Sequence, residues 1–138
     1  GGYMHTTDDR TPVTFITRYY LDKIKRLCDA HGTKLLFVTA PSPVNHTMQR
    51  HNEVQALADA LAVPYLDLNL NTEELGIDWN LDTLDGGDHL NYTGCQKATA
   101  YLQRYMQTHY TLPDRRDDVR YEAWNKQAEE FEKLLPQP

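Results

Sequence analysis

The sequence predicts an α/β fold built on a small parallel sheet, and three observations support this prediction. Two short apolar runs, at residues 35–39 and 63–68, have the length and composition of strands. Helical apolar patterns precede, separate and follow these runs. Strands joined through a helix pair in parallel with a right-handed crossover. Because two strands make a small sheet, we expect an incomplete, doubly wound parallel sheet in three α/β/α layers.

The first helix is expected over residues 12–31. Thr11 is a hydroxyl N-cap, Pro12 suits the first helical position, and Gly32 is a natural C-cap. Apolar residues at helical spacing predict that one face of this helix is buried. That face comprises Phe15, Ile16, Tyr19, Tyr20, Ile24, Leu27 and Cys28.

The first strand, 35–39, is apolar without alternation, which is typical of a strand covered on both faces. Pro41 and Pro43 end it, since proline cannot continue a ladder. A second helix is expected over about 45–61. Its predicted buried side consists of Met48, Val54, Leu57, Ala58 and Leu61. Pro64 marks the second strand, 63–68, as an edge strand or places the proline at its start.

Residues 69–91 are polar and predict a long loop with a helical turn at 72–75. A loop of this length in a compact domain is usually functional or disordered. Asn91 can cap a third helix, the segment 112–114 breaks it, and a last helix is expected over about 117–135. We therefore expect one α/β domain over residues 1–138, with 112–138 as a C-terminal helical extension.

The composition and charge of the chain argue against several classes of function. The 138 residues carry a net charge of −6 and no basic stripe, which argues against nucleic-acid binding. No apolar run approaches the roughly 20 residues that span a bilayer. Cys28 and Cys95 form no CxxC motif and specify no zinc site, so we expect two buried or half-buried thiols; a disulfide between them stays open. The first residue is not Met, and we expect a fragment of a larger protein.

The segment 84–91, LDGGDHLN, carries the candidate chemistry. It leaves the second strand at its carboxyl end, where ligands bind in open α/β sheets. Histidine is the usual general base near neutral pH, and a carboxylate can fix its tautomer and stabilise its protonated form. His89 is therefore the candidate base, with Asp85, Asp88 and Asp82 as carboxylates close in sequence.

The run His89-Leu90-Asn91, with Gly94 after it and Asp-Gly-Gly before it, resembles the last conserved block of SGNH (GDSL-type) hydrolases. In that block an Asp three residues before the His completes a Ser-His-Asp triad. Residues 35–43, the strand from Pro64 and the helix after Gly94 resemble DltD-like extracytoplasmic members, which accompany membrane-bound O-acyltransferases. The resemblance spans roughly residues 12–110.

This resemblance implies the C-terminal portion of a flavodoxin-like, three-layer SGNH domain. It further implies an ester hydrolase or acyl-transfer protein, acting on an acyl-ester small molecule or a cell-envelope polymer. An extracytoplasmic location and a membrane-bound O-acyltransferase partner are implied by the same resemblance. No cofactor is expected.

The chain departs from the family pattern in the spacing of the acid. Position 86, three residues before His89, is glycine. Asp85 is the preferred orienting residue, because an extra loop residue can bulge and keep its carboxylate near the ring. Asp88 is second, since neighbouring side chains in extended backbone point apart, and Asp82 is third.

The second departure is the nucleophile. The family's Gly-Asp-Ser block and its oxyanion-hole Gly and Asn belong to earlier strands that these residues do not contain. Ser42, the only serine, lies between two prolines, and we expect it to form a turn rather than a nucleophile elbow. Cys95 lies near His89 in sequence, so a Cys-His pair is an alternative; a core-facing thiol is the expectation.

Metal binding is not expected. The spacing of Asp82, Asp85, Asp88 and His89 does not match a calcium loop, and His46 and His51 do not form an HExxH motif. Two hypotheses remain. Either His89 and Asp85 belong to a Ser-His-Asp triad, or the chain is a non-catalytic α/β interaction or scaffold domain with a vestigial site. An incomplete sheet edge also makes a homodimer plausible.

Overall fold

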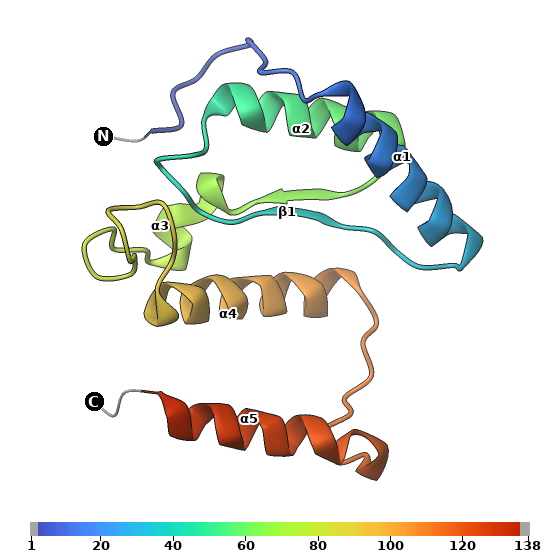
Figure 1. Ribbon diagram of the computed structural model, residues 1–138, viewed down its shortest axis with the longest axis vertical. Coiled ribbons are helices and arrows are strands. Elements are labelled where there is room, and N and C mark those ends of the chain that lie inside the picture. Colours follow the sequence, from blue (N-terminus) through green and yellow to red (C-terminus); the bar gives the residue numbers. More distant parts are fainter. Residues whose placement is uncertain (1–2, 136–138) are drawn as a thin grey trace. The chain divides into compact units, whose positions relative to one another are not determined.

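A computed structural model describes residues 3–135 (Figure 1), which divide into two compact units at Leu102/Gln103. In chain order the first unit contains α1 (Phe15–Ala30), β1 (Phe37–Thr39), α2 (Met48–Leu61), β2 (Tyr65–Asp67), η1 (Leu68–Asn71), α3 (Thr72–Leu75) and the first part of α4 (Tyr92–His109). The second contains the rest of α4, η2 (Val119–Tyr121) and α5 (Glu122–Leu134). The boundary lies inside α4, before the extension predicted from residue 112.

The sheet of the described residues has two parallel strands, β1 and β2, with Phe37 opposite Tyr65 and Thr39 opposite Asp67. Mixed helix and strand with parallel pairing is what the sequence predicts. A doubly wound sheet is not shown. The expectation that the first strand is covered on both faces is wrong, because Val38 is 41% exposed.

Helix α1 begins later than predicted. Its N-cap is Thr14, whose hydroxyl accepts the backbone N–H of Thr17. The predicted start at Thr11 fails because the Thr11 N–H donates to the carbonyl of Gln49 in α2 at 3.1 Å, which holds this segment out of the helix. The C-terminal end is as predicted, with Gly32 in the left-handed region at φ 64°.

The predicted burial of the apolar face of α1 is also wrong. None of the helix residues is buried, Phe15 is 80% exposed and Leu27 is 61% exposed. Cys28 is half-buried and free. The spacing identifies which face of the helix is apolar, but burial requires a partner layer, and the described residues supply none for this face.

The hydrophobic core is small and lies where α2 packs on β2. Leu57 and Ala58 are buried as predicted, whereas Met48, Val54 and Leu61 are only half-buried. The buried apolar residues are Leu57, Ala58, Val63, Leu66, Leu68 and Leu75. Thr47 caps α2 by accepting the N–H of Arg50.

The long segment after β2 contains the predicted helical turn, which is α3 at 72–75. The predicted cap of α4 is confirmed, since Asn91 Oδ1 accepts the N–H of Gly94 at 3.1 Å. In the second unit, the predicted last helix is η2 followed by α5, and Trp124 and Phe131 are exposed. Within residues 3–135, no helix is long and apolar enough to cross a membrane.

Candidate active site

The candidate site lies on a closed loop between α3 and α4. Thr83 and Leu90 form an isolated antiparallel bridge, and the N–H of Leu84 donates to the carbonyl of His89 at 2.9 Å. These contacts bring the two ends of the LDGGDHLN segment together. The segment therefore forms a closed loop whose two ends are hydrogen-bonded to each other.

Two glycines allow the loop to turn. Gly86 and Gly87 have φ values of 70° and 110°, in the region that favours glycine. At Gly87 a Cβ would lie 2.7 Å from Cγ of Pro43, whereas nothing lies within 4 Å of a Cβ at Gly86. Gly87 thus lets the loop pack closely on the turn that follows β1.

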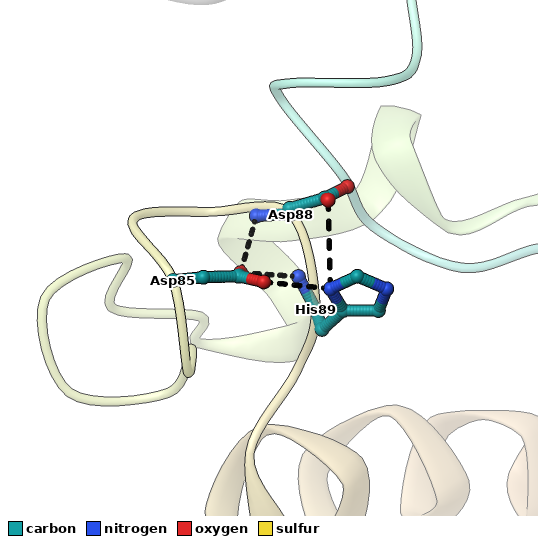
Figure 2. A group of neighbouring side chains, drawn as sticks. All are labelled: Asp85, Asp88 and His89. Atoms are coloured by element: carbon teal, nitrogen blue, oxygen red, sulfur yellow. Dashed lines mark hydrogen bonds and ion pairs between the residues drawn. The ribbon is translucent and has the colours of Figure 1, made fainter.

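Asp85 and His89 form the central pair of the loop (Figure 2). Nδ1 of His89 lies 2.7 Å from Oδ2 of Asp85. The other oxygen, Oδ1, accepts the backbone N–H groups of Asp88 at 3.0 Å and His89 at 2.8 Å. Backbone donors therefore hold the carboxylate in place. A proton on Nδ1, donated to Asp85, leaves Nε2 of the neutral ring free to accept a proton.

The electrostatics of the pair favour the protonated imidazole. The hydrogen bond to Asp85, and then the negative charges of Asp88 and Asp85, raise the pKa of His89 above its ordinary value. The hydrogen bond from His89 lowers the pKa of Asp85 below its ordinary value. The imidazole is 68% exposed, so its ring is accessible to a substrate or a partner.

The other two candidate carboxylates have different partners. Asp88 Oδ2 lies 3.5 Å from Nδ1 of His89, and its Oδ1 contacts the side-chain amide of Asn45. Asp82 is buried and pairs with Nζ of Lys97 at 2.6 Å, while also accepting the N–H of Asp78 at 2.7 Å. Asp82 thus anchors the loop to α4 instead of orienting the imidazole.

Asp85, Asp88 and His89 each offer a ligand atom within 4.8 Å of the others, the one such cluster among the described residues. A divalent cation could be held there by two carboxylate oxygens and an imidazole nitrogen. It would compete with the hydrogen bond between Asp85 and His89, since both use the same atoms.

The remaining candidates are placed differently. The hydroxyl of Ser42 accepts the N–H of Asn45 at 3.1 Å, and Ser42 forms the expected turn after β1. Cys95 is exposed, so the prediction of a core-facing thiol is wrong: Gly94 is the buried residue at this point of α4, and Cys95 faces outward. Its Sγ lies 3.8 Å from the carbonyl of Leu90. Both cysteines are free, so no disulfide joins them.

Sequence reasoning missed a second histidine–aspartate cluster. Asp67, the last residue of β2, accepts at Oδ2 from Nε2 of His46 at 2.9 Å and from Nδ1 of His51 at 2.7 Å. Its Oδ1 accepts the backbone and side-chain amides of Asn69, at 3.0 and 2.7 Å. The ring of His51 also stacks on Tyr65. The missed signal was an acid at the carboxyl end of a predicted strand.

Asp67 is ionised in this environment. Burial raises its pKa, but the hydrogen bonds from His46, Asn69 and His51 outweigh burial and hold the pKa of Asp67 well below its usual range. Burial also raises the pKa of Tyr65 well above its ordinary value. The carboxylate thereby fixes one nitrogen of each imidazole ring.

Comparisons with protein-family models, curated proteins and solved structures find no match to this chain. Functional inference therefore starts from the geometry of the two clusters. Of these, only the pair of Asp85 and His89 joins an oriented carboxylate to an exposed imidazole.

Proposed function

We propose that His89 is the general base, and Asp85 its orienting carboxylate, in a Ser-His-Asp triad that hydrolyses or transfers an acyl ester. The supporting observation is the 2.7 Å contact between Nδ1 of His89 and Oδ2 of Asp85, with Oδ1 held by two backbone N–H groups. The resemblance of residues 85–94 to the last block of SGNH hydrolases points to the same chemistry.

The proposed step is a proton transfer coupled to acyl transfer. The nucleophilic serine loses its proton to Nε2 of His89 as its oxygen bonds to the acyl carbon. The imidazolium formed is stabilised by Asp85 and by the charge of Asp88, then returns the proton to the departing alcohol. Water or an acceptor alcohol afterwards takes the acyl group from the serine.

The serine comes, in this proposal, from polypeptide outside these 138 residues. Ser42 is the only serine of the sequence, and its hydroxyl is engaged in the turn with Asn45. The substrate class is an acyl ester, on a small molecule or a cell-envelope polymer. The extracytoplasmic location and the membrane-bound O-acyltransferase partner belong to the same proposal.

The position of Ser42 also favours a second candidate function, a non-catalytic interaction or scaffold domain. In that case the pair of Asp85 and His89 is vestigial. The exposed apolar face of α1, including Phe15 and Leu27, is compatible with a role in binding a partner.

An ester assay separates the two functions. Turnover of a p-nitrophenyl acyl ester is measured with this chain and with a version extended at its N-terminus by the preceding natural residues. The triad predicts turnover in the extended version that His89→Ala abolishes. His31→Ala, which changes an exposed histidine at the end of α1, is the matched control. Undiminished turnover after His89→Ala contradicts the triad, and absence of turnover in both versions favours the scaffold.

A further inference from the structure

A cavity of about 470 Å³ lies in the first unit beside the carboxyl end of β1. Thr39, the last residue of β1, lines it together with His46, Arg50 and Val54. Residues 11–14 and Thr17 form the rest of the wall. Its size is that of small-molecule sites, and the end of a parallel strand is where such sites occur. The loop that holds His89 contributes none of the lining.

The wall formed by residues 11–14 is fixed in place. The N–H of Thr11 donates to Gln49 at 3.1 Å, and the N–H of Val13 donates to the buried carboxylate of Glu53 at 3.4 Å. Arg18 forms an ion pair with Glu53. This segment is therefore bound to α2 without a ligand, and the cavity is preformed.

The lining residues carry one guanidinium and no carboxylate. Arg50 is exposed, and one of its five N–H groups donates to the carbonyl of Asn45 at 2.6 Å. Thr11, Thr14 and Thr17 add hydroxyl groups to the lining, and those of Thr14 and Thr17 lie 2.9 Å apart in a hydrogen bond. A guanidinium that pairs with no carboxylate of the described residues, among hydroxyl groups, is suited to a carboxylate ligand.

His46 supplies the second recognition group. Its side chain is 8% exposed, and Nε2 is bound to Asp67. Nδ1 has no hydrogen-bond partner among the described residues, and His46 lines the cavity. With the proton on Nε2, Nδ1 is an acceptor and suits a ligand hydroxyl.

We propose that this cavity binds a small hydroxycarboxylate. Arg50 holds the carboxylate, Nδ1 of His46 accepts the hydroxyl proton in a hydrogen bond, and the carbon chain lies against Val13 and Val54. The juxtaposition that carries the proposal is an arginine and an aspartate-oriented histidine on one preformed cavity whose lining residues include no acid. The proposal is independent of the role proposed for His89.

The test is an NMR titration of the whole chain with 3-hydroxybutyrate. Saturable shifts are expected at Thr39, His46 and Val54. Butyrate, which lacks the hydroxyl, and methyl 3-hydroxybutyrate, which lacks the charge, are expected to bind several-fold more weakly. Arg50→Gln should weaken binding by about tenfold, the scale of a charge-assisted hydrogen bond. Arg26→Gln, on an exposed arginine of α1 paired with Asp22, is the matched control and should not change it.

A second variant distinguishes loss of ligand binding from loss of folding. Val54→Phe adds volume to the lining of the cavity from a half-buried position. It should abolish the shifts while the circular dichroism spectrum stays unchanged. Equal binding of the methyl ester, unchanged binding by Arg50→Gln, or shifts that persist in a folded Val54→Phe chain would each overturn the proposal.

Discussion

The imidazole of His89 lies 2.7 Å from the carboxylate of Asp85, although the two residues are four positions apart. The SGNH block that this loop resembles places the acid three positions before the histidine. The left-handed backbone of Gly86 and Gly87 folds the extra residue into the loop. Oδ1 of Asp85 can then accept the N–H of His89 while Oδ2 meets the ring. The altered spacing is thus compatible with an oriented imidazole.

Asp85→Asn should lower the pKa of His89. The amide keeps the shape of the side chain but removes the largest cause of the raised pKa, which is the hydrogen bond to the carboxylate. Two-dimensional NMR of the imidazole across a pH titration measures the change. Asp88 acts on His89 through its charge and not through a hydrogen bond, so Asp88→Asn should lower the pKa of His89 less. The reverse order of the two effects would assign the orienting role to Asp88.

The same pKa sets the pH dependence of the proposed reaction. A general base must be unprotonated, so kcat/KM should rise as pH increases through the raised pKa of His89. In Asp85→Asn the rise should move to lower pH, with a lower plateau because the ring is no longer oriented. The extended, active version of the chain is needed for this measurement. If the pH dependence of kcat/KM is the same in Asp85→Asn, the rate depends on the titration of a group other than His89.

Gly87→Ala should destabilise the chain more than Gly86→Ala. Both backbones have positive φ, but only at position 87 does a Cβ meet another atom, 2.7 Å from Cγ of Pro43. We expect a loss of more than about 1 kcal/mol in the free energy of unfolding for Gly87→Ala. Urea denaturation measures both variants. Equal losses would mean that the loop does not pack on Pro43.

The local features of the sequence predicted the parts of the fold that depend on neighbouring residues. Gly32 after α1, the cap at Asn91 and the turn at 72–75 follow from side-chain and backbone chemistry within a few positions. The start of α1 depends on a distant contact instead. The N–H of Thr11 is taken by Gln49, a residue far along the chain, and no local pattern indicates this.

The two histidine–aspartate clusters differ in the same respect: one depends on neighbouring residues and the other on distant contacts. Asp85 and His89 belong to one loop, so their proximity could be predicted from spacing and from the glycines between them. The cluster at Asp67 draws His46 from the segment before α2 and His51 from α2 itself. The two histidines are 21 and 16 positions before Asp67 in the sequence. The packing of α2 on β2 brings them together, and no local pattern in the sequence indicates which residues meet there.

Asp67→Asn should destabilise the fold strongly. The carboxylate accepts four hydrogen bonds in a buried position, and the amide cannot accept all of them. We expect a loss of at least about 2 kcal/mol in the free energy of unfolding. Asp29→Ala, which removes an exposed ion pair with Lys25, is the control and should cost less than about 0.5 kcal/mol.

The lowered pKa of Asp67 also predicts how the stability of the fold changes with pH. The pKa of Asp67 in the folded chain lies below its unfolded value of about 3.9. Its contribution is therefore complete above that value and is lost as pH falls toward the folded pKa. In Asp67→Asn this part of the acid destabilisation should disappear. Parallel stability curves of the two chains between neutral and acid pH would contradict the assignment of Asp67 as an ionised anchor.

Zinc should inhibit the proposed reaction. Asp85, Asp88 and His89 offer ligand atoms within 4.8 Å of one another, and a bound cation takes Nδ1 and the carboxylate oxygen that orients it. The general base would then lose its orienting hydrogen bond. NMR of the His89 imidazole during addition of Zn²⁺ measures binding, and the ester assay measures inhibition. Asp88→Asn removes a ligand but keeps the contact between Asp85 and His89, so it should relieve inhibition while retaining turnover. Activation by Zn²⁺, with loss of turnover after addition of a chelator, would replace the triad with a metal centre at the same three residues.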